Sequence, residues 1–317
     1  MSQSVPRLAE VGPWAKEKLL ALERYLDFYT KVLKRQHWWR TIYIDAFAGG
    51  GHAAIRESRP TGSPIAESLF LGDASDEPQQ QQFIRGSPRV ALDIPNPFDI
   101  YVFIDADPER VAALKQLGPY SDGRTIHVRQ GTAASEIDWV LSQRLTKDRY
   151  RGVAFLDPFG AHLEWRTIKA LAASGIFEVL INFPLHMAIN RLMTVSGEIP
   201  ANWRAQLDAF FPSGWYEHVY STPDPGLFAG TEFAAEFAAG IEKRPDAIDR
   251  LLRLYVSSLK DAFGHVSEPK LIRNTRNSPL YYLIWAGPHP KGLEGANHIL
   301  RMGENLPRSR TGGPKGR

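Results

Sequence analysis

Cysteine is absent from this chain of 317 residues. Its absence excludes a disulfide scaffold, a zinc–thiolate site, an iron–sulfur cluster bound by this chain and a cysteine nucleophile. No apolar run approaches the ~18 residues that span a bilayer, so no membrane segment is predicted. The opening MSQSVPRLAEVGPW lacks the basic-then-apolar order of a signal peptide, and we therefore expect a cytoplasmic protein.

The residues that are present have an ordinary globular composition, with 43% hydrophobic and 23% charged residues and a formal net charge of +3. The length allows either one large domain with an insertion or two domains. We predict one main domain over residues 1–300. The last residues, 301–317, are basic and poor in apolar side chains, which predicts a disordered tail. Such a tail is more often solvated than bound to a nucleic acid backbone.

Apolar residues at helical spacing predict an amphipathic helix over about 12–35. The segments RTIYIDAF, DIYVFIDAD, RTIHVRQG, GVAFLDPFG and IFEVLINFP then alternate with helices, which predicts a parallel sheet. A helical, aromatic-rich insertion is expected at about 190–265, followed by a hairpin at about 268–287. The predicted fold class is therefore α/β: a Rossmann-like sheet of five parallel strands closed by a C-terminal β-hairpin. This is the order found in class I methyltransferases, although the order alone also fits other doubly wound folds.

The segment between the first two strands is irregular. We expect a helix to follow the TGSP motif, which ends with Gly62 to Pro64. A surface loop is expected at Gln79 to Gln82. The following RVALDI is predicted to be a short strand.

The stretch YIDAFAGGGHAA places a carboxylate just before three glycines. Read as G-x-G-x-x-A, Gly49 and Gly51 make only a weak dinucleotide fingerprint. A nicotinamide site needs an acid about 20 residues further on, whereas Asp105 lies 54 residues after Gly51. Asp45 would also repel a pyrophosphate. It would instead attract S-adenosyl-L-methionine, which carries an ammonium and a sulfonium. We predict that Asp45, Phe47, Gly49 and Gly51 bind this cofactor.

Three further side chains are candidate cofactor ligands. Asp105 ends the second strand, where its carboxylate can accept both ribose hydroxyls; the alternative is that Asp105 and Asp107 only cap helices, and we assign capping to Asp107. Thr132 follows the third strand, and its hydroxyl can bond an adenine ring. Lys18 on the first helix can reach the cofactor carboxylate, although such a lysine is more often solvated.

The DPFG turn after the fourth strand is the predicted catalytic element. The Asp157 carboxylate and the Pro158 carbonyl can hold an –NH2 group with its lone pair aimed at the sulfonium methyl, and Phe159 can stack on a planar substrate. The alternative is a turn with a packed phenylalanine. His162 and His186 can shape the substrate pocket. Their spacing fits no metal motif, so we predict no metal.

Several longer motifs carry a family resemblance. The chain resembles the three-Cys-motif partner proteins from about Gly12 to Gly292, in VGPWAKEKLLALERYLDFYTKVL, YIDAFAGGG, GSPIAESL, FLDPFGAHLEW, LINFPLHMAINRLM, NWRAQLDAFFPSGWYEHVY and PLYYLIWAGPHPKG. The resemblance implies a class I methyltransferase-like fold and, as a partner, a radical enzyme-like three-Cys-motif protein encoded nearby.

DPFG is also similar to the corresponding turn of tRNA guanine-N2 dimethyltransferases and to the (D/N)PP(Y/F) motif of amino-methylating nucleic acid enzymes, although it has one proline rather than two. That similarity implies methylation of an exocyclic amine in a nucleic acid or a nucleotide. The alternative hypothesis is a non-catalytic accessory partner that keeps the fold, and a nicotinamide dehydrogenase is a distant third.

Overall fold

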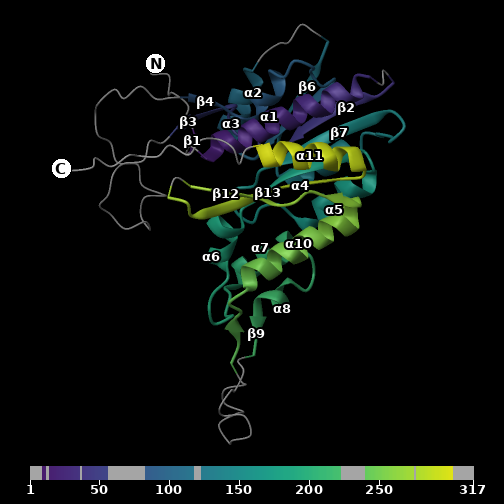
Figure 1. The fold of residues 1–317 in the computed structure, drawn as a ribbon. Helices are drawn as coiled ribbons and strands as arrows, with labels where there is room; N and C mark the ends of the chain where they lie inside the picture. Colours follow the sequence, from purple (N-terminus) through teal and green to yellow (C-terminus); the bar gives the residue numbers. More distant parts are fainter. Residues whose placement is uncertain are drawn as a thin grey trace, which may run out of the picture.

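The computed structural model describes residues 9–11, 14–35, 38–55, 83–117, 123–222, 240–274 and 276–302 (Figure 1). The expected helix after Gly62 to Pro64, the Gln79 to Gln82 loop and residues 303–317 lie outside this part of the chain. None of the helices in the described ranges is both long and apolar enough to cross a bilayer.

A mostly parallel sheet forms the centre of the molecule. Its parallel strands lie in the order β6-β5-β2-β7-β8. Their bounds are β2 (Arg40–Asp45), β5 (Ile100–Asp105), β6 (Thr125–Gln130), β7 (Tyr150–Leu156) and β8 (Phe177–Phe183). β2, β7 and β8 are almost wholly buried, as expected for β-branched and aromatic runs covered on both faces.

A C-terminal hairpin completes the sheet. β13 (Pro279–Gly287) runs antiparallel to β8, and β12 (Lys270–Arg273) pairs with β13 across the predicted turn. The short β11 (His265–Val266) also pairs with β13. The predicted fold class, five parallel strands closed by a C-terminal hairpin, is therefore confirmed.

Helices cover both faces of the sheet and create two separate cores. One face carries α1 (Trp14–Leu33), α2 (Ser87–Leu92), α3 (Pro108–Lys115) and α11 (Pro290–Met302); the other carries α4 (Ala133–Leu141), α5 (Trp165–Ser174) and α10 (Ala247–Phe263). Figure 1 shows α1 and α11 side by side across the first face, although they lie at opposite ends of the sequence.

The described part of the segment between β8 and α10 is mainly helical. It contains η1 (Leu185–Ile189), α6 (Asn190–Leu192), α7 (Ala201–Phe210) and α8 (Trp215–Val219), with the two-residue strands β9 (Tyr220–Ser221) and β10 (Glu242–Lys243). An aromatic stack joins this segment to the sheet: the Phe183 and Tyr255 rings are 4.2 Å apart, and the Phe183 and Phe210 rings are 5.8 Å apart. These aromatic side chains are core residues.

One strand prediction is wrong. RVALDI belongs to α2 and the turn after it. Pro88 lies in the first turn of this helix, and its Val90, Ala91 and Leu92 are buried against the α1 side of the sheet. Tertiary burial overrides the β-propensity of so short a run. A small sheet of β1 (Ala9–Val11), β3 (His52–Ile55) and β4 (Phe83–Arg85) was not predicted, since strands of three or four residues carry little periodicity.

Candidate functional site

Four neighbouring parallel strands end in polar residues on one face of the sheet. Side chains of a strand alternate between faces, so each polar residue shares a face with the buried residue two positions before it. The pairs are Tyr43 and Asp45, Phe103 and Asp105, Phe155 and Asp157, and Leu180 and Asn182. We call Asp45, Asp105, Asp157 and Asn182 the polar row. The row crosses the point where the strand order reverses around β2, which is where α/β sheets bind ligands.

Asp45 is enclosed, with an exposed fraction of 0%. The Tyr43 hydroxyl donates to its Oδ2 at 3.3 Å, whereas its Oδ1 has no hydrogen-bond partner among the described residues. Burial raises the pKa of Asp45 to about 7; the Ser87 hydroxyl opposes this rise, and the nearby Asp157 charge adds to it. A buried carboxyl with a free acceptor oxygen is suited to a cationic ligand. Because no solvent reaches it, direct contact with a ligand requires a neighbouring side chain to move.

The conformation of the glycine loop after β2 is fixed by two positive φ angles and by hydrogen bonds of its backbone amides. Gly49 and Gly51 have φ values of +62° and +78°, in the left-handed region that favours glycine. The Ala48 amide donates to the Ile104 carbonyl at 2.9 Å, and the Gly49 amide donates to Asp105 Oδ2 at 2.9 Å. No atom lies within 4 Å of the place where a Cβ of Gly49 would stand. The loop therefore borders open space at the carboxyl edge of the sheet.

Asp105 connects this loop to β5 and α3. Its Oδ1 accepts from the Asp107 amide at 2.9 Å, and Arg110 Nη1 lies 3.8 Å from its Oδ2. A carboxylate has about four acceptor positions, so Asp105 keeps capacity for ribose hydroxyls. Asp107 caps α3 by accepting from the Glu109 and Arg110 amides, as predicted. Capping is therefore the role of Asp107 and not of Asp105.

Asp157 is held from two sides. Lys18 of α1 forms an ion pair with its Oδ2, and Asn182 Nδ2 donates to its Oδ1 at 2.5 Å. The Lys18 side chain is only 14% exposed, and its Nζ lies 5.7 Å from the centre of the Tyr281 ring. Lys18 is thus not a solvated surface lysine. It contacts the predicted substrate-side carboxylate, and its predicted contact with a cofactor carboxylate stays a prediction.

Sequence reasoning missed Asn182 as a site residue. Its side chain is 6% exposed, and its Oδ1 has no hydrogen-bond partner within the described residues. The signal was present in LINFP, where a polar residue stands one position before the end of a buried strand and two before a proline.

The DPFG turn places its members in different surroundings. Pro158 is buried, whereas Phe159 is 59% exposed, with the Arg110 guanidinium carbon 5.7 Å from its ring centre. Gly160 completes the turn with a φ of +84°. Phe159 is therefore not a packed core residue, and one face of its ring remains available for stacking.

The remaining candidates lie around the row. The Thr132 hydroxyl caps α4 by accepting from the Ser135 amide at 3.1 Å, so its predicted contact with adenine would have to share that oxygen. His186 Nε2 lies 3.5 Å from the Tyr282 hydroxyl, and burial lowers the pKa of His186. His162 is exposed. Within the described ranges, no three His, Asp or Glu side chains are grouped as metal ligands.

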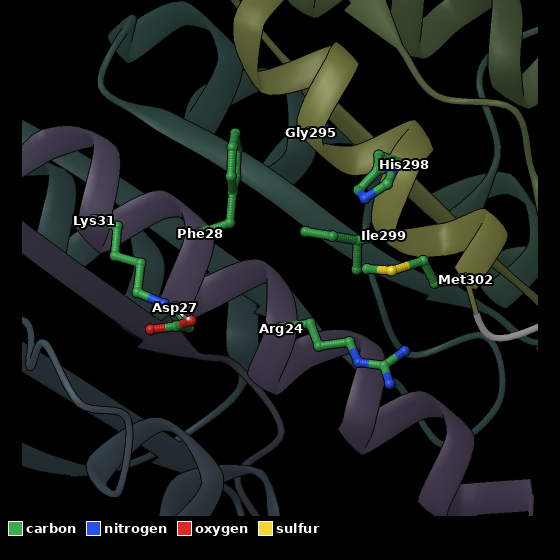
Figure 2. Close-up of a pocket in the computed structure, with 8 residues that line it drawn as sticks. All are labelled: Arg24, Asp27, Phe28, Lys31, Gly295, His298, Ile299 and Met302. Carbon is green, nitrogen blue, oxygen red and sulfur yellow. Dashed lines mark hydrogen bonds and ion pairs between the residues drawn. The ribbon is translucent and has the colours of Figure 1, made fainter.

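A hollow of about 320 Å³ lies between α1 and α11 (Figure 2). Arg24, Asp27 and Phe28 line it from α1, and His298, Ile299 and Met302 line it from α11. Its lining includes no member of the polar row, so this hollow is separate from the candidate site.

Comparisons with known proteins give only distant likenesses. No family model matches the chain, and no curated protein matches it. Protein LPL1258 from Legionella pneumophila is 11% identical, with a TM-score of 0.44 over 89% of this chain and 91% of that chain. Human methyltransferase-like protein 13, solved with S-adenosylhomocysteine, is 12% identical, with a TM-score of 0.39 over 93% of this chain and 94% of that chain.

Trm1 from Pyrococcus horikoshii, solved with S-adenosyl-L-methionine, is 12% identical, with a TM-score of 0.32 over 87% of this chain and 57% of that chain. With TM-scores this low, these likenesses support no conclusion about the chemistry of this chain. Membership of the three-Cys-motif partner family stays a prediction.

Proposed function

We propose that this chain is a methyltransferase that uses S-adenosyl-L-methionine and acts on an exocyclic amine of a nucleobase, in a nucleic acid or a nucleotide. The observation that supports the proposal is the polar row, an array of acceptor oxygens at the switch point of the sheet. Two of its buried oxygens, Asp45 Oδ1 and Asn182 Oδ1, lack a donor among the described residues. Such a site suits ligands that are cationic and rich in N–H and O–H groups.

The cofactor-side residues would hold different parts of the ligand. Asp45 would attract the ammonium, the backbone at Gly49 and Gly51 would pack against the methionyl part, and Asp105 would accept the ribose hydroxyls. We assign contacts with the adenine to Phe47 and Thr132, and a contact with the cofactor carboxylate to Lys18. The bound cofactor supplies an activated methyl group. A dinucleotide fits less well, because its pyrophosphate would lie beside Asp45.

The substrate-side residues would position an amine. Asp157 and the Pro158 carbonyl can accept its N–H groups, which leaves the nitrogen lone pair free to point at the methyl carbon. Phe159 can stack on the base that bears the amine. Methyl transfer requires the two reacting atoms to be held about 3 Å apart rather than a strong base.

Ligand titration tests the cofactor half of the proposal. We expect calorimetry to show that the protein binds S-adenosylhomocysteine and not NAD. Asp45→Ala should weaken this binding about tenfold or more, because a charge-assisted contact is lost, whereas Asp157→Ala should change it less than about threefold. Tight binding of NAD would overturn the proposal.

Transfer of a labelled methyl group tests the catalytic half. RNA, DNA and small-molecule fractions from cells are incubated with the protein and labelled S-adenosyl-L-methionine. We expect one fraction to take up the label, and Asp157→Ala to reduce the rate about 100-fold, because the nucleophile loses its position.

A second candidate function is an accessory partner of a nearby three-Cys-motif protein. Both oxygens of Asp157 are occupied by Lys18 and Asn182 in the ligand-free fold, as expected for a structural cluster. Retained binding of S-adenosylhomocysteine with no labelled product in any fraction would favour this candidate.

A further inference from the structure

The side chain of Asn182 is half satisfied in a buried position. It lies near the carboxyl end of β8 and is 6% exposed. Its Nδ2 donates to Asp157 Oδ1, while its Oδ1 accepts from no described residue. An unpaired buried acceptor is costly, so its presence calls for an explanation. A ligand that supplies the missing donor is such an explanation.

The orientation of the Asn182 amide is fixed by Asp157. In the β7–β8 register Leu156 pairs with Ile181, so the next residues, Asp157 and Asn182, stand opposite each other. A flipped amide would place its oxygen against a carboxylate oxygen, which is two acceptors face to face. Lys18 holds the other carboxylate oxygen. The free amide oxygen and the remaining acceptor positions of Asp157 therefore form one adjacent pair.

We propose that Asn182 determines substrate specificity: its Oδ1, rather than the Pro158 carbonyl, accepts one N–H of the substrate amino group while Asp157 accepts the other. This inference rests on the proposed function. Two acceptors match the two N–H groups of a primary amine. A hydroxyl group or a secondary amine offers one donor and would leave a buried acceptor unpaired, which is a strong basis for rejection.

The same geometry limits the product to one methyl group. In the transfer, the nitrogen lone pair forms the N–C bond while the C–S bond breaks and its electron pair stays on sulfur, leaving S-adenosylhomocysteine. The nitrogen then loses a proton to water and keeps a single N–H. The monomethylated amine can satisfy only one of the two acceptors, so a second transfer is disfavoured. The chain is thus a monomethylating enzyme, despite the similarity of DPFG to a dimethyltransferase turn.

Product analysis tests this inference. The nucleic acid or nucleotide fraction that takes up label is digested to nucleosides, and mono- and dimethylated amines are separated by mass spectrometry. We expect the wild-type protein to give at least about tenfold more monomethyl than dimethyl product, the ratio that one unpaired buried acceptor supplies. A predominantly dimethylated amine, or a methylated hydroxyl or carbon, would overturn the inference and leave methyltransferase activity standing. Label in no fraction would overturn the inference and count against catalysis as well.

Variants separate specificity from folding. Asn182→Leu removes the free acceptor, so the ratio of monomethyl to dimethyl product should fall toward one while the overall rate decreases. A general loss of folded protein would not change that ratio. The control is Asn297→Leu on α11, which removes an exposed amide that accepts from the Glu268 backbone far from the row and should leave the ratio unchanged. If Asn182→Leu does not fold, Asn182→Ser, with a shorter hydroxyl acceptor, provides the same comparison. An unchanged ratio in the Asn182 variant would overturn the proposal.

Discussion

The two ends of β8 carry buried polar residues of opposite character. At the amino end, Glu178 accepts from the Tyr25 hydroxyl, which in turn accepts from Trp285 Nε1 at 2.6 Å. At the carboxyl end, Asn182 keeps an acceptor oxygen without a partner among the described residues. Burial raises the pKa of Glu178 to about 7, as it raises that of Asp45 in the polar row.

A raised pKa therefore does not distinguish the candidate site from its structural support. Both carboxyls are enclosed by the same face of one sheet, and burial shifts them by similar amounts. The difference lies in the partners: the amino end forms a closed chain of hydrogen bonds, whereas the carboxyl end contains acceptors that no described donor satisfies. Unpaired buried acceptors that gather at the switch point of the sheet are the more specific sign of a ligand site.

The largest expected effect is on stability at the amino end. The folded-state pKa of Glu178 is raised from 4.5 to about 7, so the folded protein binds this proton more tightly than the unfolded chain. The resulting contribution is fully present below about pH 4.5 and is lost as the pH rises to about 7, a change on the order of 3 kcal/mol.

Glu178→Gln should therefore flatten this part of the pH dependence. Urea denaturation at about pH 5 and about pH 8 should show a smaller difference for the variant than for wild type, with the slope due to Asp45 remaining. An unchanged slope would mean that burial does not raise the pKa of Glu178 as it raises that of Asp45.

The next effect separates a paired hydroxyl from an unpaired one. Tyr25→Phe removes the donor to Glu178 and should destabilise the protein by about 1–3 kcal/mol. Tyr29 lies one turn further along α1, and its buried hydroxyl has no hydrogen-bond partner among the described residues. Tyr29→Phe removes an unpaired buried hydroxyl and should therefore leave stability unchanged or raise it. Urea denaturation of both variants measures the difference in their free energies of unfolding. An equal loss of stability in the two variants would contradict the distinction between the paired and the unpaired hydroxyl.

At the carboxyl end, pH should act on ligand affinity. A cationic ligand prefers the ionised form of Asp45, whose pKa in the ligand-free protein is about 7. Affinity for S-adenosylhomocysteine should therefore be about tenfold weaker near pH 6 than near pH 8, with proton release on binding. Calorimetry in buffers of different ionisation enthalpy measures both quantities. Asp45→Asn should remove this pH dependence, and a profile that persists in the variant would assign it to another group.

The smallest effect concerns the glycine loop. Gly49→Ala places a methyl group at a φ of +62°, which costs about 1 kcal/mol, and directs that methyl into the open space beside the loop. Gly50→Ala is the matched control, because Gly50 is not at positive φ and its added methyl would lie 3.8 Å from Ala113. We expect Gly49→Ala to weaken S-adenosylhomocysteine binding more than Gly50→Ala does. The reverse order would place the ligand elsewhere.

The sequence predicted the sheet and three members of the polar row because their signals are local. Asp45, Asp105 and Asp157 each end an apolar run beside a glycine, proline or helix cap. Asn182 precedes Pro184 by two residues, but its importance depends on lying opposite Asp157, a pairing that only the register gives. Lys18 was ambiguous for the same reason, because an amphipathic helix does not reveal which strand end its polar side chains reach.

Short segments account for the remaining errors. RVALDI has the composition of a strand, yet its apolar residues fill the space beside α1 in a helical turn. The partners of Glu178 could not be inferred either, since Tyr25 and Trp285 come from two other elements at opposite ends of the chain. Contacts of this kind depend on how distant segments pack, and no local pattern encodes them.

Helix α1 supplies both Lys18 to Asp157 and Tyr25 to Glu178, and it is made near the start of the chain. Its partners Asp157, Glu178 and Trp285 follow at separations of 139, 153 and 260 residues. On the ribosome, these three contacts of α1 cannot form until most of the chain has emerged, whereas its packing against α2 can form earlier. Long-range closure of this kind slows folding and exposes nascent chains to aggregation.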